Sequence, residues 1–328
     1  MKTALIHVGA HKAGSTTIQA TLFKSRNGLD DKGIYSFVGL GEQHQLLSMK
    51  FWRDQRKYNI IKKSLSSLDE IRKASEIHWK RLADEVRYRQ PRLTVISEEA
   101  LLRVPDIASL HDHLYNIFDH VLILVYVREP VTRLPSSLGQ RIIAGKTFEN
   151  LISLNSLVPR MLPNISRYRL FFGASNIIVR NFDTQNFVER SLIQDISYVI
   201  SNIVDEKISL VDVPIKNQSL SANNLTQLLK ENERTFKNGF VKTPEWVSRR
   251  KKNVKKMQVD LTLLGGTKLK LSDSGIRSHL WSKWTVEASL LNEHYLKDQI
   301  QIAVPSEKEP LPKNLFNYKM SKWLFENK

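Results

Sequence analysis

The chain has 328 residues, of which 41% are hydrophobic, and this is enough apolar material for the core of one large domain. Cysteine is absent, which excludes disulfides and thiolate metal sites and favours a reducing compartment. Fifty Lys and Arg against 33 Asp and Glu give a net charge of +17, so anionic partners are expected, although the sequence holds no nucleic-acid-binding signature.

The first expected element is a short strand over residues 4–8, followed by a loop and a helix. Two glycines and a lysine lie in the loop, and three hydroxyl residues open the helix: Gly9, Lys12, Gly14, Ser15, Thr16 and Thr17. Such a loop directs N–H groups, hydroxyls and a cation at a phosphate or sulfate. A nucleoside triphosphatase has lysine directly after the second glycine, where this chain has Ser15. The pattern therefore predicts an anion site and argues against ATP with magnesium.

Three further apolar runs are continuous rather than alternating, which is typical of central strands in a parallel sheet: residues 93–97, 121–127 and 176–180. Patterns of helical spacing predict helices over residues 68–86, 107–118, 130–144 and 188–201. Strands that alternate with helices predict a doubly wound α/β fold with a mainly parallel central sheet and helices on both faces.

Beyond residue 209 the strand signal fades, and the chain is expected to be helical over 219–231 and 279–301 and irregular over 237–274. We therefore expect one domain over 1–328. It comprises an α/β core over 1–209, a helical and basic appendage over 210–304 and a C-terminal extension over 305–328. The sharpest basic run lies over residues 249–256. It predicts either a solvated face or a contact with an acidic glycan, a membrane surface or a nucleotide phosphate.

Ligands of open parallel sheets bind at the carboxyl ends of the strands, and these ends carry charged residues. Glu98 and Glu99 follow the second predicted strand, Arg128 follows the third, and Arg180 ends the fourth. Ser136 lies two turns into the helix after Arg128, and an arginine fork with a serine hydroxyl suits a phosphate. If these strands are neighbours, their ends share one crevice.

The loop and the Arg128 segment together resemble the sulfotransferases that use 3′-phosphoadenosine 5′-phosphosulfate (PAPS). The residues that match the family's 5′-phosphosulfate loop are His7, Gly9, Lys12, Gly14, Ser15, Thr16 and Gln19. Those that match its 3′-phosphate element are Arg128, Arg133 and Ser136. The resemblance spans roughly residues 1–230, is nearest to bacterial carbohydrate-type members, and implies a P-loop-like fold.

The resemblance implies a site for PAPS and its product PAP, and no metal. The residues expected to bind PAPS are His11, Lys12, Ala13, Gly14, Ser15, Thr16, Thr17, Arg128 and Ser136. Lys12 is expected to stabilise charge on the leaving PAP, and Glu98 to act as general base. Glu99, His7, His11 and His44 are the alternatives for the base, and the residue that stacks on adenine stays open.

The expected acceptor is a hydroxyl of an anionic or cell-surface polysaccharide, or of a lipid-linked sugar. No apolar run approaches the roughly 18 residues of a membrane span, and the N-terminus does not resemble a signal peptide. We therefore expect a cytoplasmic protein. An alternative form of this prediction places it in peripheral contact with the inner face of the membrane. Two other functions compete with this prediction: a P-loop kinase-like phosphotransferase and a non-catalytic binder of acidic glycans.

Overall fold

The computed structural model describes eight stretches of the chain: residues 1–37, 45–52, 68–147, 151, 161–213, 220–236, 243–264 and 274–297. The chain divides into two compact units. The first comprises Met1–Arg128, Arg160–Lys216 and Leu291–Ile300. The second comprises Glu129–Pro159, Asn217–Leu290 and Gln301–Lys328. The division into core, appendage and extension at residues 209 and 304 stays a prediction.

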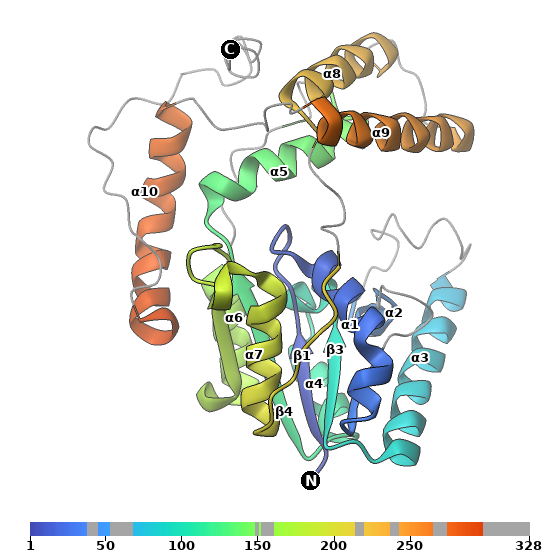
Figure 1. Cartoon of the computed structure of the whole chain (residues 1–328), viewed down its shortest axis with the longest axis vertical. Helices are drawn as coiled ribbons and strands as arrows, with labels where there is room; N and C mark the ends of the chain where they lie inside the picture. Colours follow the sequence, from blue (N-terminus) through green and yellow to red (C-terminus); the bar gives the residue numbers. More distant parts are fainter. Residues whose placement is uncertain are drawn as a thin grey trace. The chain divides into compact units, whose positions relative to one another are not determined.

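The first unit is built on a five-stranded sheet (Figure 1). Its strands are β1 (Thr3–His7), β2 (Ile34–Ser36), β3 (Leu93–Ser97), β4 (His120–Val127) and β5 (Ile177–Asn181). The order is β2-β3-β1-β4-β5, and every neighbouring pair is parallel. This confirms the predicted α/β fold and makes the four strands that were expected to share a crevice true neighbours.

Helices cover both faces of this sheet. They are α1 (Ser15–Asp30), α3 (Leu68–Arg89), α4 (Ile107–Tyr115), α6 (Met161–Phe172) and α7 (Leu192–Val204). The connection from β1 to β2 runs toward one edge of the sheet and that from β3 to β4 toward the other. Right-handed crossovers therefore place α1 and α4 on opposite faces. α1 contacts α7, and α4 contacts α6. α3 joins the α4 face, where the Trp79 and His113 rings lie 4.5 Å apart.

Short elements complete the first unit. They are α2 (Gln45–Met49), the 3-10 turns η3 (Glu99–Arg103), η6 (Ala174–Asn176) and η7 (Val188–Arg190), and the π-helical turn η8 (Asn292–Leu296). The helix predicted over 188–201 begins after Ser191 instead, because Ser191 caps α7. β1 is buried along its whole length, and in β4 only His120 is partly exposed. Such two-sided burial explains the continuous apolar runs.

The second unit is helical, as expected for the C-terminal part. Its described helices are α5 (Pro130–Ile143), α8 (Ala222–Phe236), α9 (Pro244–Leu264) and α10 (Ser274–Leu291). They contribute to one apolar core that includes Leu138, Ile142, Leu225, Val254 and Leu280.

The prediction of irregular structure over 237–274 is wrong for α9 (Pro244–Leu264). Trp246, Arg250 and Val254 form the buried side of its first three turns. An arginine therefore stands at a core position among many exposed lysines, and this hides the apolar spacing that predicts a helix. In the part of the chain that the structure describes, no helix has the length and apolarity to cross a bilayer.

Candidate functional site

The loop between β1 and α1 lies at the carboxyl end of the central strand and is folded tightly. Gly9, Lys12 and Gly14 have left-handed backbone angles, with φ of 93°, 67° and 77°. A methyl group on Gly9 would lie 2.9 Å from Cα of Glu99, and one on Gly14 would lie 2.8 Å from the Phe182 ring. Both glycines are therefore required by backbone angle and by space.

The start of α1 offers unpaired backbone donors. The N–H groups of Thr17 and Ile18 donate to the carbonyl of Gly14 at 2.9 and 3.0 Å. Those of Gly14, Ser15 and Thr16 have no acceptor in hydrogen-bond geometry among the described residues, and Gly14 supplies no side-chain cap. The open N–H groups and the positive end of the helix dipole create an anion site.

The predicted site residues 11–17 differ in how open they are. Ala13 is fully buried, and its N–H donates to Ala10 at 3.1 Å, so it contributes packing to the loop. The Ser15 hydroxyl, also buried, makes a long 3.4 Å hydrogen bond to the carbonyl of Ala10, while Thr17 is buried and Thr16 partly exposed. The available groups are therefore mainly the N–H groups, Thr16 and Lys12.

His11, Lys12 and Glu99 form a charged cluster beside these donors. Nδ1 of His11 lies 2.5 Å from Oε1 of Glu99, and each side chain is 37% exposed. Burial would raise the pKa of Glu99, but the hydrogen bond from His11 and the charges of His11 and Lys12 outweigh it and lower that pKa. Burial lowers the pKa of Lys12; Arg128 adds to this shift and Glu99 opposes it. The loop thus brings two predicted catalytic residues into one electrostatic cluster.

Arg128 lies at the end of β4 and contacts the loop directly. Its Nη1 donates to the carbonyl of Lys12 at 2.7 Å, and its guanidinium lies 5.2 Å from the centre of the Phe182 ring. Arg128 therefore holds the loop in place whatever else it binds. Ser136 lies partly exposed on α5 in the second unit, and its predicted pairing with Arg128 stays a prediction.

Glu98 differs from its neighbour Glu99, because its side chain turns inward to α2. It is 0% exposed, and its Oε1 accepts a hydrogen bond from the N–H of Ser48 at 3.0 Å, while Oε2 has no partner in the described structure. Burial raises the pKa of Glu98 to about 8, although hydrogen bonds from Ser48 and Leu47 oppose the shift. A base must reach its acceptor, and this buried side chain has no surface through which it can do so.

Two other residues of the motif join strands and helix. His7 is fully buried, with Nδ1 2.8 Å from the Ser97 hydroxyl, and burial lowers its pKa to about 4. Gln19 donates from α1 to the carbonyl of Ser97 at 3.0 Å. His7 therefore links β1 to β3, and Gln19 links α1 to β3, so both residues support the loop between β1 and α1. His44 lies outside the described residues.

Arg180 is tied into the core rather than offered to a ligand. Its guanidinium forms an ion pair with Asp195, which is 0% exposed and also accepts a 2.8 Å hydrogen bond from the hydroxyl of Tyr126.

Phe182, two residues after Arg180, was not predicted as a site residue from the sequence, although it contacts both Gly14 and Arg128. Its only signal is an aromatic residue just after a strand.

No family model and no curated protein matches the chain. Among solved structures it is similar to a sulfotransferase from Alicyclobacillus acidocaldarius. The identity is 16%, the match covers 70% of this chain and 92% of that chain, and the TM-score is 0.42. It is also similar to a chain from the PezAT chromosomal toxin–antitoxin system of Streptococcus pneumoniae, at 14% identity. That match covers 79% of this chain and 88% of that chain, with a TM-score of 0.31. At these identities and TM-scores, neither similarity carries a functional argument.

Proposed function

We propose that this protein is a sulfotransferase that moves the sulfuryl group of PAPS to a hydroxyl of a glycan. The observation that carries the proposal is the β1–α1 loop, where open N–H groups, Lys12 and Arg128 meet at one sheet edge. The sequence of this loop resembles the phosphosulfate loop of that family, and lysine is missing from the position that a triphosphatase requires.

PAPS carries two separate anionic ends, and the proposal gives each its own residues. The N–H groups of Gly14, Ser15 and Thr16 would hold the 5′-phosphosulfate, and Arg128 with Ser136 the 3′-phosphate. Lys12 would neutralise the charge that develops on the leaving PAP, which is a transition-state role. This lysine is already partly desolvated, and a desolvated cation interacts more strongly with such a charge.

Transfer forms a bond from the acceptor oxygen to sulfur and breaks the bond from sulfur to the bridging oxygen of PAP, which keeps the electron pair. The acceptor proton must pass to a base. We propose His11 for this role, because an Nδ1–H donated to Glu99 leaves Nε2 free to accept a proton. Glu99 is then the positioning residue. The buried Glu98 is the competing assignment.

The glycan acceptor is proposed from the resemblance to carbohydrate-type members and from the net charge of +17, which favours an anionic or cell-surface polysaccharide or a lipid-linked sugar.

Thermal denaturation with three nucleotides tests the donor site. PAP without magnesium should raise the melting temperature, and a ligand at a hundred times its Kd adds about 2.7 kcal/mol to the unfolding free energy. AMP lacks the 3′-phosphate and should stabilise less than PAP, and Arg128→Ala should remove most of that difference. Stabilisation by ATP with magnesium and none by PAP would instead support the kinase-like phosphotransferase.

A further inference from the structure

The basic run of the sequence lies on α9, which buries one of its residues and exposes the others. Arg250 is 4% exposed and belongs to the buried side of α9. Five other basic residues are exposed: Arg249, Lys251, Lys252, Lys255 and Lys256. We name these five the basic face of α9. One arginine of the run is therefore structural, and the rest are presented to solvent.

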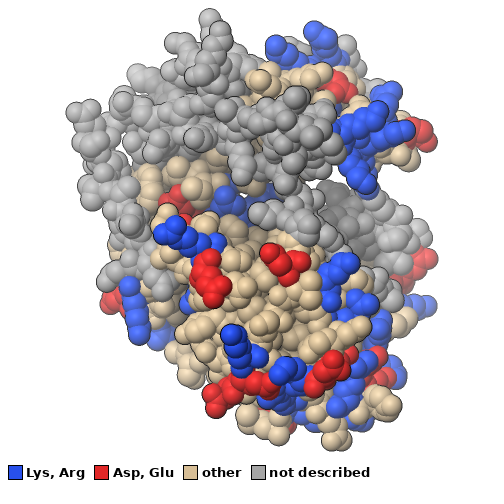
Figure 2. Space-filling model, viewed as in Figure 1, with Lys and Arg blue, Asp and Glu red and all other residues tan. Residues whose placement is uncertain are grey.

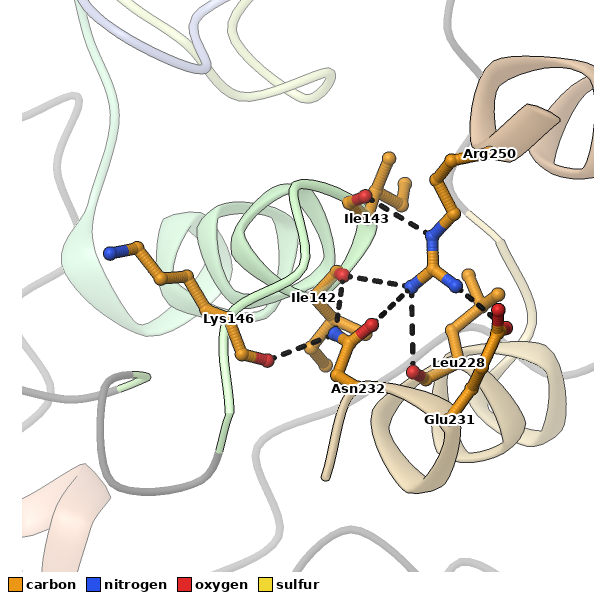
Figure 3. A network of polar contacts seen from close by, with 7 residues as sticks. All are labelled: Ile142, Ile143, Lys146, Leu228, Glu231, Asn232 and Arg250. Atoms are coloured by element: carbon orange, nitrogen blue, oxygen red, sulfur yellow. Dashed lines mark hydrogen bonds and ion pairs between the residues drawn. The ribbon is translucent and has the colours of Figure 1, made fainter. Parts of the chain in front are cut away.

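Arg250 fixes α9 against two other helices of the second unit (Figure 3). Its Nη2 donates to the carbonyl of Ile142 in α5 at 3.1 Å and to Oδ1 of Asn232 in α8 at 2.8 Å. Its Nη1 pairs with Glu231 at 2.8 Å, and its Nε donates to the carbonyl of Ile143 at 3.3 Å. These contacts from one buried guanidinium set the rotation of α9, so the exposed charges are held in a fixed arrangement.

The basic face lacks the acidic partners found elsewhere. None of its five side chains forms an ion pair with a described residue, whereas Glu206 pairs with both Lys32 and Arg92 in the first unit. Glu245 is the one acid in the described first turn. Lys251 and Lys255 are four residues apart, as are Lys252 and Lys256, and like charges at this spacing repel. Figure 2 shows basic side chains gathered over α8 and α9. An anionic partner would relieve this repulsion.

We propose that the basic face of α9 binds an acidic linear polysaccharide, the acceptor chain of the proposed sulfuryl transfer; the acceptor role rests on the proposed function. From residue 249 to residue 256 the helix rises about 10 Å, so the face can contact neighbouring charged sugars of one linear chain. Lysine ammonium groups suit this partner because they bind spaced carboxylates or sulfates without a fixed bidentate geometry.

The composition of this face disfavours two other polyanions. Over residues 243–257, no large aliphatic or aromatic side chain is exposed. A helix that binds a membrane surface inserts an apolar face, and here that face is used by the core of the second unit. A single-stranded nucleic acid is gripped by aromatic stacking, which this face cannot supply.

Binding of alginate oligosaccharides, measured by calorimetry at several salt concentrations, tests the inference. The variant replaces all five residues of the basic face by Gln and keeps Arg250. The matched control replaces five basic residues of α3 by Gln: Arg72, Lys73, Lys80, Arg81 and Arg87. Both proteins lose the same net charge. We expect the α9 variant to lose at least tenfold in affinity and to show a shallower salt dependence, and the α3 variant to stay within twofold of the wild type.

Equal alginate affinity of the α9 variant and the wild type, or an equal loss in both variants, would overturn the proposal. So would anionic phosphatidylglycerol vesicles or a DNA duplex that bind more tightly than alginate and depend on the same five residues. If the fivefold variant does not fold, Lys251→Glu with Lys255→Glu makes the same test. The increase in melting temperature caused by PAP is measured on the same proteins. If PAP does not stabilise the wild type, the proposed donor site is wrong, and the proposal for the basic face of α9 is still decided by the alginate result.

Discussion

Lys12 has a left-handed backbone angle in the middle of the loop, and its side chain lies within the field of Glu99 and Arg128. We expect Lys12→Ala to lower turnover at saturating PAPS by 10²–10³-fold, about 3–4 kcal/mol, as for loss of one oxyanion donor. Lys24→Ala, at an exposed position on α1, is the control and should leave turnover unchanged. Near wild-type turnover of Lys12→Ala would show that the lysine is not the leaving-group cation.

His11, Glu99 and Glu98 differ enough in exposure and hydrogen bonding for substitutions to show which residue is the base. His11→Ala and Glu99→Gln should each lower kcat by about 10²–10⁴-fold, while the Kd for PAP changes less than in Arg128→Ala, because the proposal assigns the PAP phosphates to the loop N–H groups and Arg128. Glu98→Gln should keep most of its activity, since its side chain is closed to solvent. If Glu98→Gln is inactive and His11→Ala is active, Glu98 is the base, as the family resemblance implied.

Glycines of the loop and of α1 provide a comparison at the scale of the element. Gly14→Ala should lower the free energy of unfolding by about 1–3 kcal/mol, because φ is 77° and the added methyl overlaps Leu192 and Phe182. Gly28→Ala, inside α1, has no atom within 4 Å of the added methyl and should raise stability by up to about 1 kcal/mol. Urea denaturation measures the free energy of unfolding of both variants. Equal effects would contradict the close approach of Leu192 and Phe182 to Gly14.

The contact of Glu98 with α2 makes stability depend on pH. The pKa of Glu98 is raised from 4.5 to about 8, so between these values the native state keeps a proton that the unfolded state has released. The stability contributed by this group is therefore complete below pH 4.5 and falls as pH rises toward 8. Glu98→Gln stays neutral, so it should match the wild type near pH 5 and become the more stable protein toward pH 8.

This comparison is made as the difference between the two proteins at each pH, because His7 titrates in both and cancels. A difference in melting temperature that stays constant from pH 5 to pH 8 would contradict the burial of an uncharged Glu98.

The sequence predicts elements best where burial is two-sided. β1, β3 and β4 were found because continuous apolar runs mark strands covered on both faces, whereas β5 is an edge strand with alternating burial and was found from its apolar residues alone. β2 (Ile34–Ser36) has three residues, too few for any periodicity. α9 was missed because Arg250 occupies a core position, where its charge is satisfied by carbonyl groups and Glu231 that no local pattern reveals.

The candidate site was predictable as a loop but not in its details. The spacing of the glycines and the lysine predicts the loop, and the structure places the loop at the same strand ends as Arg128. Whether Glu98 or Glu99 faces the loop depends on the direction of each side chain at the end of β3, which the residue types do not reveal. The structure pairs Glu99 with His11 and buries Glu98 under α2.

At the scale of the whole molecule, two kinds of anion binding are proposed, each on its own unit. The described donor groups around Lys12 belong to the first unit, and the basic face of α9 belongs to the second. Substitutions in one set should therefore leave binding at the other set intact when each is measured alone.

Transfer of label from radiolabelled PAPS to an acceptor panel tests the central claim most directly. The panel contains acidic and neutral polysaccharides, a simple phenol and a tyrosine peptide, each with and without a chelator. We expect label on a polysaccharide hydroxyl, unaffected by chelation and lost in Lys12→Ala. Transfer to phenol or peptide alone would contradict the glycan assignment. Absence of any sulfuryl transfer, together with phosphoryl transfer from labelled ATP, would contradict the proposed function itself.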